Sequence, residues 1–240
     1  MKKILKLIGI IIFTIMIIVL TYVIYVLVDY TRLEDNINLN IKKAKHNTEE
    51  IILVNNKYRI ASYNVGFGAY SDDYSFFMDG GKESRAKSKK AVNENLGGAI
   101  KELKKLNSDF LLIQEIDEDG DRSWHVNEKK IIEDNFDGFD SVYAQNYDSP
   151  YLFWPLNEPH GANKAGLMLL SNVKITSAIR RSLPIEKGLM KFIDLDRCYS
   201  INRMPVNNGK ELVIFGLHLS AYTSDGAIAE KQLEMLGKDM

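Results

Sequence analysis

The sequence predicts an α/β fold, because a strand, an amphipathic helix and a second strand follow one another along the chain. Residues 58–67, YRIASYNVGF, alternate as a packed strand does. Residues 84–107 place apolar side chains at helical spacing, with lysines on the opposite face. Residues 110–115, FLLIQE, form an apolar run typical of a strand covered on both faces. Together these segments predict a β-α-β unit.

Length and composition favour one globular domain with an anchor. The chain has 240 residues, of which 45% are hydrophobic and 26% charged, so a sizeable core can form. The 31 Lys plus Arg balance 32 Asp plus Glu, so net charge does not indicate a nucleic-acid partner. Cys198 is the single cysteine, which excludes an intrachain disulfide and a cysteine-based zinc site. Neither a GxxxxGKS/T loop nor a GxGxxG fingerprint is present, which disfavours nucleotide-dependent kinases and dehydrogenases.

An apolar segment near the N-terminus predicts a single-pass membrane anchor. Residues 4–28 would form a helix roughly 37 Å long, enough to span a bilayer core with some tilt. Lys2 and Lys3 precede this segment and Asp29 follows it, so the positive-inside rule puts the N-terminus in the cytoplasm and the rest outside the cytoplasmic membrane. A cleaved signal peptide is the alternative, but its apolar region is usually only ~7 to 15 residues long.

The remaining segments predict a stalk and a folded domain. We expect the anchor to occupy residues 1–28, a polar stalk residues 29–56, and the domain residues 57–240. Within the domain, GLMLLS and VKITSAI are further strand candidates. CYSINRMPV and ELVIFGLHLS flank an Asn-Asn-Gly turn and predict a hairpin. Ile228 and Met235 lie on one face of a predicted last helix.

Two polar side chains in the predicted strands are candidates for chemistry. Glu115 closes the FLLIQE strand, where a carboxylate can hold a hard cation, since Mg²⁺ commonly uses one or two carboxylates together with water or phosphate oxygens. His218 lies on the same side of the ELVIFGLHLS strand as Leu212, Ile214 and Gly216. Taken singly, Glu115 is better explained as a solvated acid at the start of a loop, and His218 as a core histidine with satisfied nitrogens.

Read together, several segments resemble one known superfamily. SYNVGF with Asn64, LLIQE with Glu115, NEPHG with Glu158, a strand beginning at Arg197 and GLHLS with His218 are similar in order and spacing to the endonuclease/exonuclease/phosphatase superfamily. The segments YNVGFGAY, FFMDGGKESRAKS and QEIDEDGDRSWHVNE resemble a bacterial membrane-anchored branch of this superfamily. The similarity covers residues 57–240.

The resemblance implies a four-layered α/β sandwich of two packed mixed sheets flanked by helices, with the active site at one rim. By this resemblance, Glu115 binds Mg²⁺, with Mn²⁺ as the alternative metal, and Asn64 positions the metal or its water. His218 hydrogen-bonds the scissile phosphate, and Glu158 orients that histidine. Arg197 clamps a nonbridging phosphate oxygen, which suits its fork of donors.

The superfamily also has an Asp-x-Asn segment after the histidine and a Ser-Asp-His near its C-terminus, and neither occurs in this chain. We therefore expect a C-terminally truncated copy of the fold, whose sheets would expose an unpaired edge.

The expected activity is Mg²⁺-dependent hydrolysis of a phosphate ester outside the cytoplasmic membrane. Nucleic acid, a phospholipid headgroup and a sugar phosphate remain alternative substrates, because the candidate specificity loops at 66–83, 117–127 and 147–163 do not distinguish them. Residues 4–28 make the lipid bilayer a further partner, and no protein partner is evident. The alternative is a non-catalytic binding or interaction domain derived from the same fold.

Overall fold

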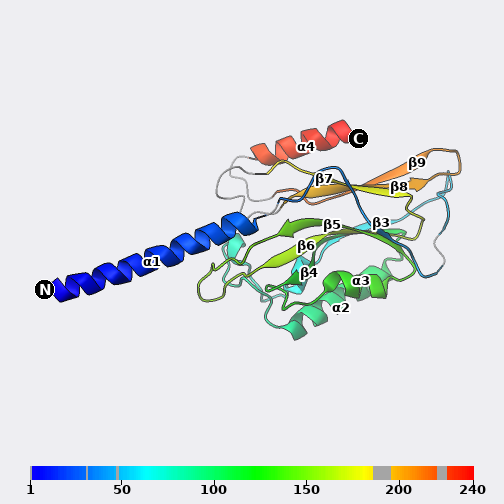
Figure 1. Ribbon diagram of the computed structural model, residues 1–240. Helices are drawn as coiled ribbons and strands as arrows, with labels where there is room; N and C mark the ends of the chain where they lie inside the picture. Colours follow the sequence, from blue (N-terminus) through cyan, green and yellow to red (C-terminus); the bar gives the residue numbers. More distant parts are fainter. Residues whose placement is uncertain (1, 31, 47–48, 186–195, 221–225) are drawn as a thin grey trace.

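A computed structural model describes residues 2–30, 32–46, 49–185, 196–220 and 226–240. Within these residues two β-sheets pack face to face, with helices on both outer faces (Figure 1). The five-stranded sheet has the order β2-β5-β6-β4-β3, and the four-stranded sheet has the order β1-β7-β8-β9. Helices α2 and α3 cover the first sheet, and α4 covers the second. The predicted four-layered sandwich is therefore confirmed.

The strands are β1 (Ile37–Asn38), β2 (Ile41–Lys42), β3 (Ile60–Asn64), β4 (Phe110–Gly120), β5 (Asp140–Asp148), β6 (Asn163–Ser171), β7 (Ser177–Ser182), β8 (Cys198–Pro205) and β9 (Glu211–Leu217). The helices are α1 (Lys2–Asp29), α2 (Lys89–Lys105), α3 (Glu128–Asn135) and α4 (Ala227–Asp239), with short 3-10 turns η1 (Gly66–Gly68) and η2 (Phe77–Asp79). The five-stranded sheet is mixed. The described pairs of the four-stranded sheet are all antiparallel, where a mixed sheet was expected. Strands β7, β8 and β9 are neighbours both in sequence and in the sheet, and β1 pairs antiparallel with β7.

The predicted β-α-β unit is present as β3, α2 and β4. The two strands are parallel, and Asn64 faces Gln114 in their register. Helix α2 begins after Ser88, whose hydroxyl accepts a hydrogen bond from the Ala91 N–H at 3.1 Å. Its apolar stripe lies buried against the sheet and consists of Val92, Leu96, Ile100 and Leu103. The helical spacing of the sequence therefore determined which face of α2 packs inward.

The core between the sheets brings β9 close to β4. Buried side chains from both sheets meet there, including Phe110, Val142, Leu169, Ala178, Met204 and Ile214. Gly216 in β9 permits the close approach, because a Cβ at this position would lie 2.9 Å from Ser200 Oγ and 3.2 Å from Leu112 Cδ2. The end of β9 is thereby held next to the part of β4 that leads to Glu115.

The segment expected to be a stalk instead runs along the domain. Strand β1 pairs with β7 and β2 pairs with β5, so the segment adds an edge strand to each sheet. Ile52 lies in the inter-sheet core and is 6% exposed. Strands of two residues leave no alternation that a sequence can reveal, and they form here because existing sheet edges offer them partners. The folded part of the chain therefore begins before residue 57.

Strand β3 forms an exposed edge of the five-stranded sheet. Ile60 is 54% exposed and Tyr63 46% exposed, although both belong to a strand. Edge strands of this kind carry backbone groups without a sheet partner on one side.

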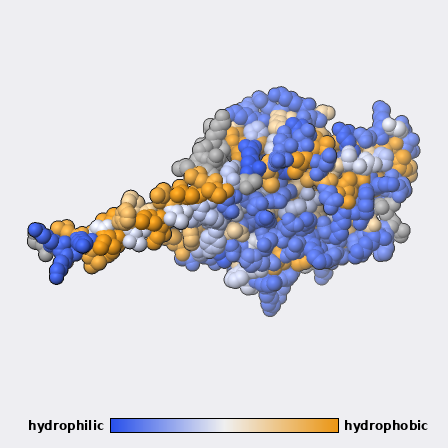
Figure 2. Space-filling model, in the orientation of Figure 1, coloured by the Kyte–Doolittle hydropathy of each residue, from blue (hydrophilic) through white to orange (hydrophobic). Residues whose placement is uncertain are grey.

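Helix α1 projects away from the sandwich (Figure 1). It is long and apolar enough to cross a membrane, by length and composition. The apolar surface of α1 contrasts with the mostly hydrophilic surface that the domain presents in the same view (Figure 2).

Candidate functional site

The ends of β3 and β9, the start of β8 and a bulge in the middle of β4 bring four of the candidate residues together. Asn64 is the last residue of β3, and Glu115 lies in β4. Arg197 directly precedes β8 and His218 directly follows β9, and the pairing of Tyr199 with Leu217 brings these two residues together. Because the sheets pack face to face, the β3–β4 pair and the β8–β9 pair present their side chains to the same region.

Glu115 is presented by a β-bulge. The register between β4 and β6 shifts between Ile113 and Ile116, so β4 carries one extra residue there. Glu115 itself has a φ of 55°, in the left-handed region that a non-glycine residue rarely adopts. A bulge re-aims a side chain out of the regular alternation, and strained residues of this kind occur at functional sites. The conformation therefore supports the prediction that Glu115 is more than a solvated acid.

Asn64 orients the Glu115 carboxylate. The Asn64 Nδ2 donates to Glu115 Oε1 at 2.9 Å, and the Gly66 N–H donates to Asn64 Oδ1 at 2.9 Å. The second bond determines which way the amide points, because only the amide oxygen accepts a hydrogen bond. The amide oxygen is thus engaged by the backbone, and Asn64 acts through Glu115.

His218 is held between Arg197 and Glu115. The Arg197 Nη1 donates to His218 Nδ1 at 3.2 Å, and His218 Nε2 lies 3.6 Å from Glu115 Oε1. Burial and then the Arg197 charge lower the pKa of His218 to about 4, against the opposing pull of Glu115. Arginine has no acceptor, so Nδ1 must carry the lone pair and Nε2 the proton. His218 therefore presents a neutral Nε2–H toward the region beside Glu115.

Glu158 lies outside this group. Its Oε2 accepts a hydrogen bond from the Ser84 backbone N–H at 2.8 Å, and the Ser84 hydroxyl donates to the Glu158 carbonyl. Among the hydrogen bonds and ion pairs of the described residues, none joins Glu158 to His218. The expected orienting contact is thus not formed, because the carboxylate is used to tie the loop before β6 to the loop before α2.

The donors present fit Mg²⁺ with a small number of protein ligands. Glu115 supplies a carboxylate whose side chain is 23% exposed. Among the described residues, no group of three or more His, Cys, Asp or Glu side chains is arranged so that it could hold a metal ion by itself. Mg²⁺ is commonly bound through one or two carboxylates, with water and substrate phosphate oxygens as its other ligands. Glu115, held in place by Asn64, suits that mode of binding.

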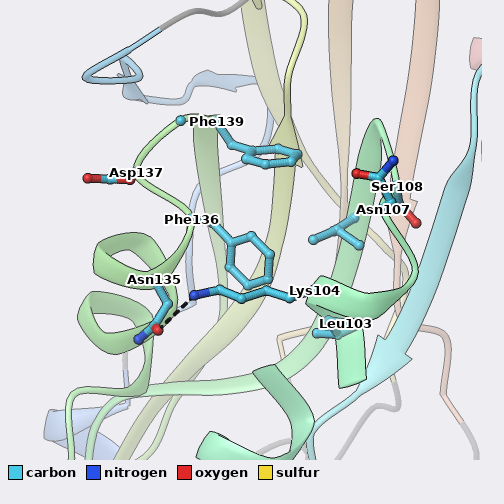
Figure 3. A pocket seen from close by; sticks show the side chains of 10 residues that line it. Leu103, Lys104, Asn107, Ser108, Asn135, Phe136, Asp137 and Phe139 are labelled. Carbon is cyan, nitrogen blue, oxygen red and sulfur yellow. Dashed lines mark hydrogen bonds between the residues drawn. The ribbon is translucent and has the colours of Figure 1, made fainter. Parts of the chain in front are cut away.

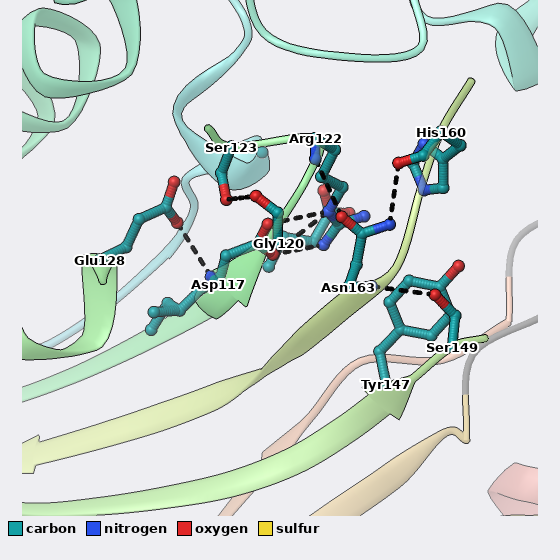
Figure 4. A network of polar contacts seen from close by, with 12 residues as sticks. Asp117, Gly120, Arg122, Ser123, Glu128, Tyr147, Ser149, His160 and Asn163 are labelled. Carbon is teal, nitrogen blue, oxygen red and sulfur yellow. Dashed lines mark hydrogen bonds and ion pairs between the residues drawn. The ribbon is translucent and has the colours of Figure 1, made fainter. Parts of the chain in front are cut away.

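A buried polar network surrounds Asp117, two residues after Glu115 in β4 (Figure 4). The sequence patterns did not predict it. Arg122 donates to Asp117 through Nη2 at 2.6 Å and through Nε at 3.0 Å, and both side chains are buried. The Asp117 N–H in turn donates to Glu128 Oε2 at 3.0 Å. Burial and then the neighbouring Asp117 charge raise the pKa of Glu128 well above its usual range. The acidic run after Glu115 was the only signal of this network in the sequence.

Two hollows lie in the described part of the molecule away from the Glu115–His218 pair. One, of about 280 Å³, lies between the C-terminal ends of α2 and α3, where Lys104 Nζ donates to Asn135 Oδ1 at 3.2 Å (Figure 3). It lies beside the start of β4, since Ser108 and Leu111 also line it. The other, of about 500 Å³, has mostly aromatic and aliphatic walls and includes Tyr22 of α1 and Trp154.

Comparisons with known proteins found similar solved structures but no similar curated sequences. No protein-family model matches the chain, and no curated protein sequence matches it. An endonuclease/exonuclease/phosphatase from Beutenbergia cavernae DSM 12333 is similar in structure, with a TM-score of 0.54 and 13% identity over 76% of this chain and 44% of that one. A family protein from Leptotrichia buccalis C-1013-b has a TM-score of 0.50 and 12% identity over 77% of this chain and 62% of that one.

A third similar structure is ANGEL2, a 2',3'-cyclic phosphatase, with a TM-score of 0.50 and 16% identity over 83% of this chain and 49% of that one. The chain thus spans between 44% and 62% of the length of these solved structures. At these low identities, the structural match shows similarity of fold alone. The chain has the fold of the endonuclease/exonuclease/phosphatase superfamily.

Proposed function

We propose that the protein is a metal-dependent phosphoesterase, tethered to the cytoplasmic membrane by α1 with its domain outside. The observation that supports this most is the convergence of a strained carboxylate, Glu115, with a neutral histidine and an arginine from the other sheet. Phosphate ester hydrolysis needs charge neutralisation on the phosphate oxygens and a positioned water. Those requirements match the groups gathered at this rim.

Each residue has a distinct task in this proposal. Mg²⁺ or Mn²⁺ bound at Glu115 would neutralise phosphate charge and lower the pKa of a water molecule. Asn64 keeps the Glu115 carboxylate pointing toward that position. His218 donates its Nε2–H to a phosphate oxygen, and Arg197 supplies positive charge beside it. Because His218 is neutral, it acts as a hydrogen-bond donor at neutral pH.

The test is hydrolysis by the full protein as its native gene encodes it. Soluble phosphodiester and phosphomonoester substrates are assayed with Mg²⁺, with Mn²⁺ and with a chelator. We expect Glu115→Ala and His218→Ala each to lose at least roughly a hundredfold in kcat/KM. Glu158→Gln is the matched control: its amide oxygen still accepts from the Ser84 N–H, so we expect activity close to that of the unaltered protein. Undiminished activity in both alanine variants would refute the proposed roles of Glu115 and His218.

The competing function is a non-catalytic binding domain on the same fold. Two hydrogen-bond donors, Arg197 and His218, lie side by side at this rim and can bind a phosphate group without a metal. The same assay separates the two functions. Binding of phosphate esters without turnover, unchanged by the chelator, would favour the binding domain over the enzyme.

A further inference from the structure

The end of α1 packs against the loop that joins β5 to β6. The Tyr22 hydroxyl donates to the Tyr151 carbonyl at 3.0 Å, and the Tyr151 N–H donates to the Tyr25 hydroxyl oxygen at 3.0 Å. The Tyr22 ring meets the Phe153 ring edge to face, with centroids 4.8 Å apart. The apolar helix and this loop therefore form one continuous surface.

The loop itself is apolar and exposed. We call residues 151–156 the aromatic loop. Three of its side chains are open to solvent, with Phe153 at 50%, Trp154 at 65% and Leu156 at 76% exposure. Residues 150–157 carry no charged side chain. Contiguous exposed apolar side chains of this size, next to a cavity of about 500 Å³ that they help to line, mark a contact surface.

The depth of the contact along α1 indicates what covers this surface. The apolar segment at 4–28 is about 37 Å long, whereas a bilayer core is about 30 Å thick, so a centred helix extends beyond the core by about 3 to 4 Å at each end. Tyr22 lies six residues before Val28, or about 9 Å along the helix axis. A side chain that touches Tyr22 is thus about 5 Å inside the core boundary. Tyrosine and tryptophan are also the residues enriched at such boundaries.

We propose that the aromatic loop inserts into the outer leaflet of the bilayer that α1 spans. Phe153, Trp154 and Leu156 then meet the boundary between headgroups and acyl chains, as the apolar faces of interfacial segments do. Tyr22 and Tyr25 anchor the loop to the helix from the membrane side. The occupant of this surface is lipid.

The insertion also orients the proposed active site. Leu152 of the loop pairs with Gly161, two residues before β6 begins at Asn163, and Gly166 in that strand faces Ile116 beside Glu115. Three residues of strand correspond to about 10 Å. Just beyond α1, the Leu33 N–H donates to Asp196 Oδ2 at 3.0 Å, next to Arg197. The site therefore lies near the headgroups, and, if the proposed function holds, its substrate is a phosphate ester of a membrane lipid.

Two tryptophans make the insertion measurable in the full chain. Trp124→Phe leaves Trp154 as the reporter, and Trp154→Phe leaves Trp124, which lies in another loop and donates through Nε1 to the Ala86 carbonyl at 2.6 Å. Each variant is reconstituted in phosphatidylcholine vesicles with or without brominated acyl chains. We expect brominated lipid to quench Trp154 roughly twofold or more strongly than Trp124. Equal quenching of the two, with Trp154 open to aqueous iodide, would overturn the insertion.

The substrate class is tested separately with Phe153→Ser and Leu156→Ser. Both variants are first checked for an unchanged melting temperature. Hydrolysis of phospholipid in vesicles of equal parts phosphatidylcholine and phosphatidylglycerol is compared with that of a soluble phosphodiester. We expect the lipid activity to fall roughly tenfold while the soluble activity stays within about twofold. An equal fall on both substrates would refute the lipid assignment. Absence of hydrolysis in the unaltered protein would refute the proposed function, while the quenching result still decides the insertion.

Discussion

Replacing Arg122 by methionine tests the buried network behind the proposed site. The Arg122 guanidinium donates to Asp117 through both Nε and Nη2 and lies 4.2 Å from the centre of the Phe67 ring. Burial disfavours its charge, but the Asp117 carboxylate outweighs that effect and raises the pKa of Arg122. Asp117 is 0% exposed, so the variant leaves a carboxylate without a cation and without water. We expect a large, pH-dependent loss of stability.

The size of the loss follows from the two ways in which Asp117 can respond. Removing one partner of a buried ion pair costs about 3 to 5 kcal/mol. The carboxylate can instead take up a proton, which for an ordinary aspartate costs about 4 kcal/mol at pH 7 and about 1.5 kcal/mol at pH 5. The lost contact of Arg122 with Phe67 adds about 1 kcal/mol. The expected losses are therefore about 5 kcal/mol at pH 7 and about 2 to 3 kcal/mol at pH 5.

Urea unfolding of the full chain in detergent micelles, followed by near-ultraviolet circular dichroism, measures this difference at both pH values. The control variant combines Arg122→Met with Asp117→Leu, which removes both charges. It should recover most of the stability, because an apolar pair of similar volume can replace a buried ion pair. A loss below about 1 kcal/mol in the single variant, or the same loss at pH 7 and pH 5, would refute the reasoning.

Three further predictions concern pH and topology. Burial lowers the pKa of His160 to about 3, so this residue contributes its full stability above pH 6.5, and that contribution is lost as the pH falls toward 3. Urea titrations should show that the free energy of unfolding decreases by about 2 kcal/mol between pH 7 and pH 5, and that His160→Gln abolishes this decrease. Burial raises the pKa of Glu128, so the ionised carboxylate destabilises the folded protein increasingly as the pH rises. Glu128→Gln should therefore raise the melting temperature more at pH 8 than at pH 5, and an equal rise at both pH values would contradict this explanation. Cys198 is buried, so the native cysteine should not react with an impermeant maleimide in intact cells. By the proposed topology the reagent should label Lys210→Cys, outside the membrane, and should not label Lys2→Cys; the reverse pattern would refute that topology.

Local patterns in the sequence were sufficient for much of the fold. Helix α2 formed where apolar residues recur at helical spacing, and β4 formed where the apolar run FLLIQE predicted a strand covered on both faces. Periodicity predicts such elements because each one buries the side chains that define it. The positions of Asn64, Arg197 and His218 near strand ends then followed from where those patterns stop, whereas β4 continues beyond Glu115 to Gly120.

Only the tertiary structure decided how these residues meet. The bulge that re-aims Glu115 depends on the register with β6, which a strand pattern does not specify. Glu158 bonds to Ser84 because two distant loops meet there, although the superfamily resemblance implied a contact with His218.

The sequence by itself thus determined most of the longer elements, the apolar helix α1 and the residue types available for chemistry. The tertiary structure decided the strand partners of residues 37–42, the pairing of Arg122 with Asp117 and the contact of α1 with the aromatic loop. The physical reason is range: propensity and periodicity act over a few neighbouring residues, whereas burial, register and ion pairing depend on groups that only the folded chain brings together.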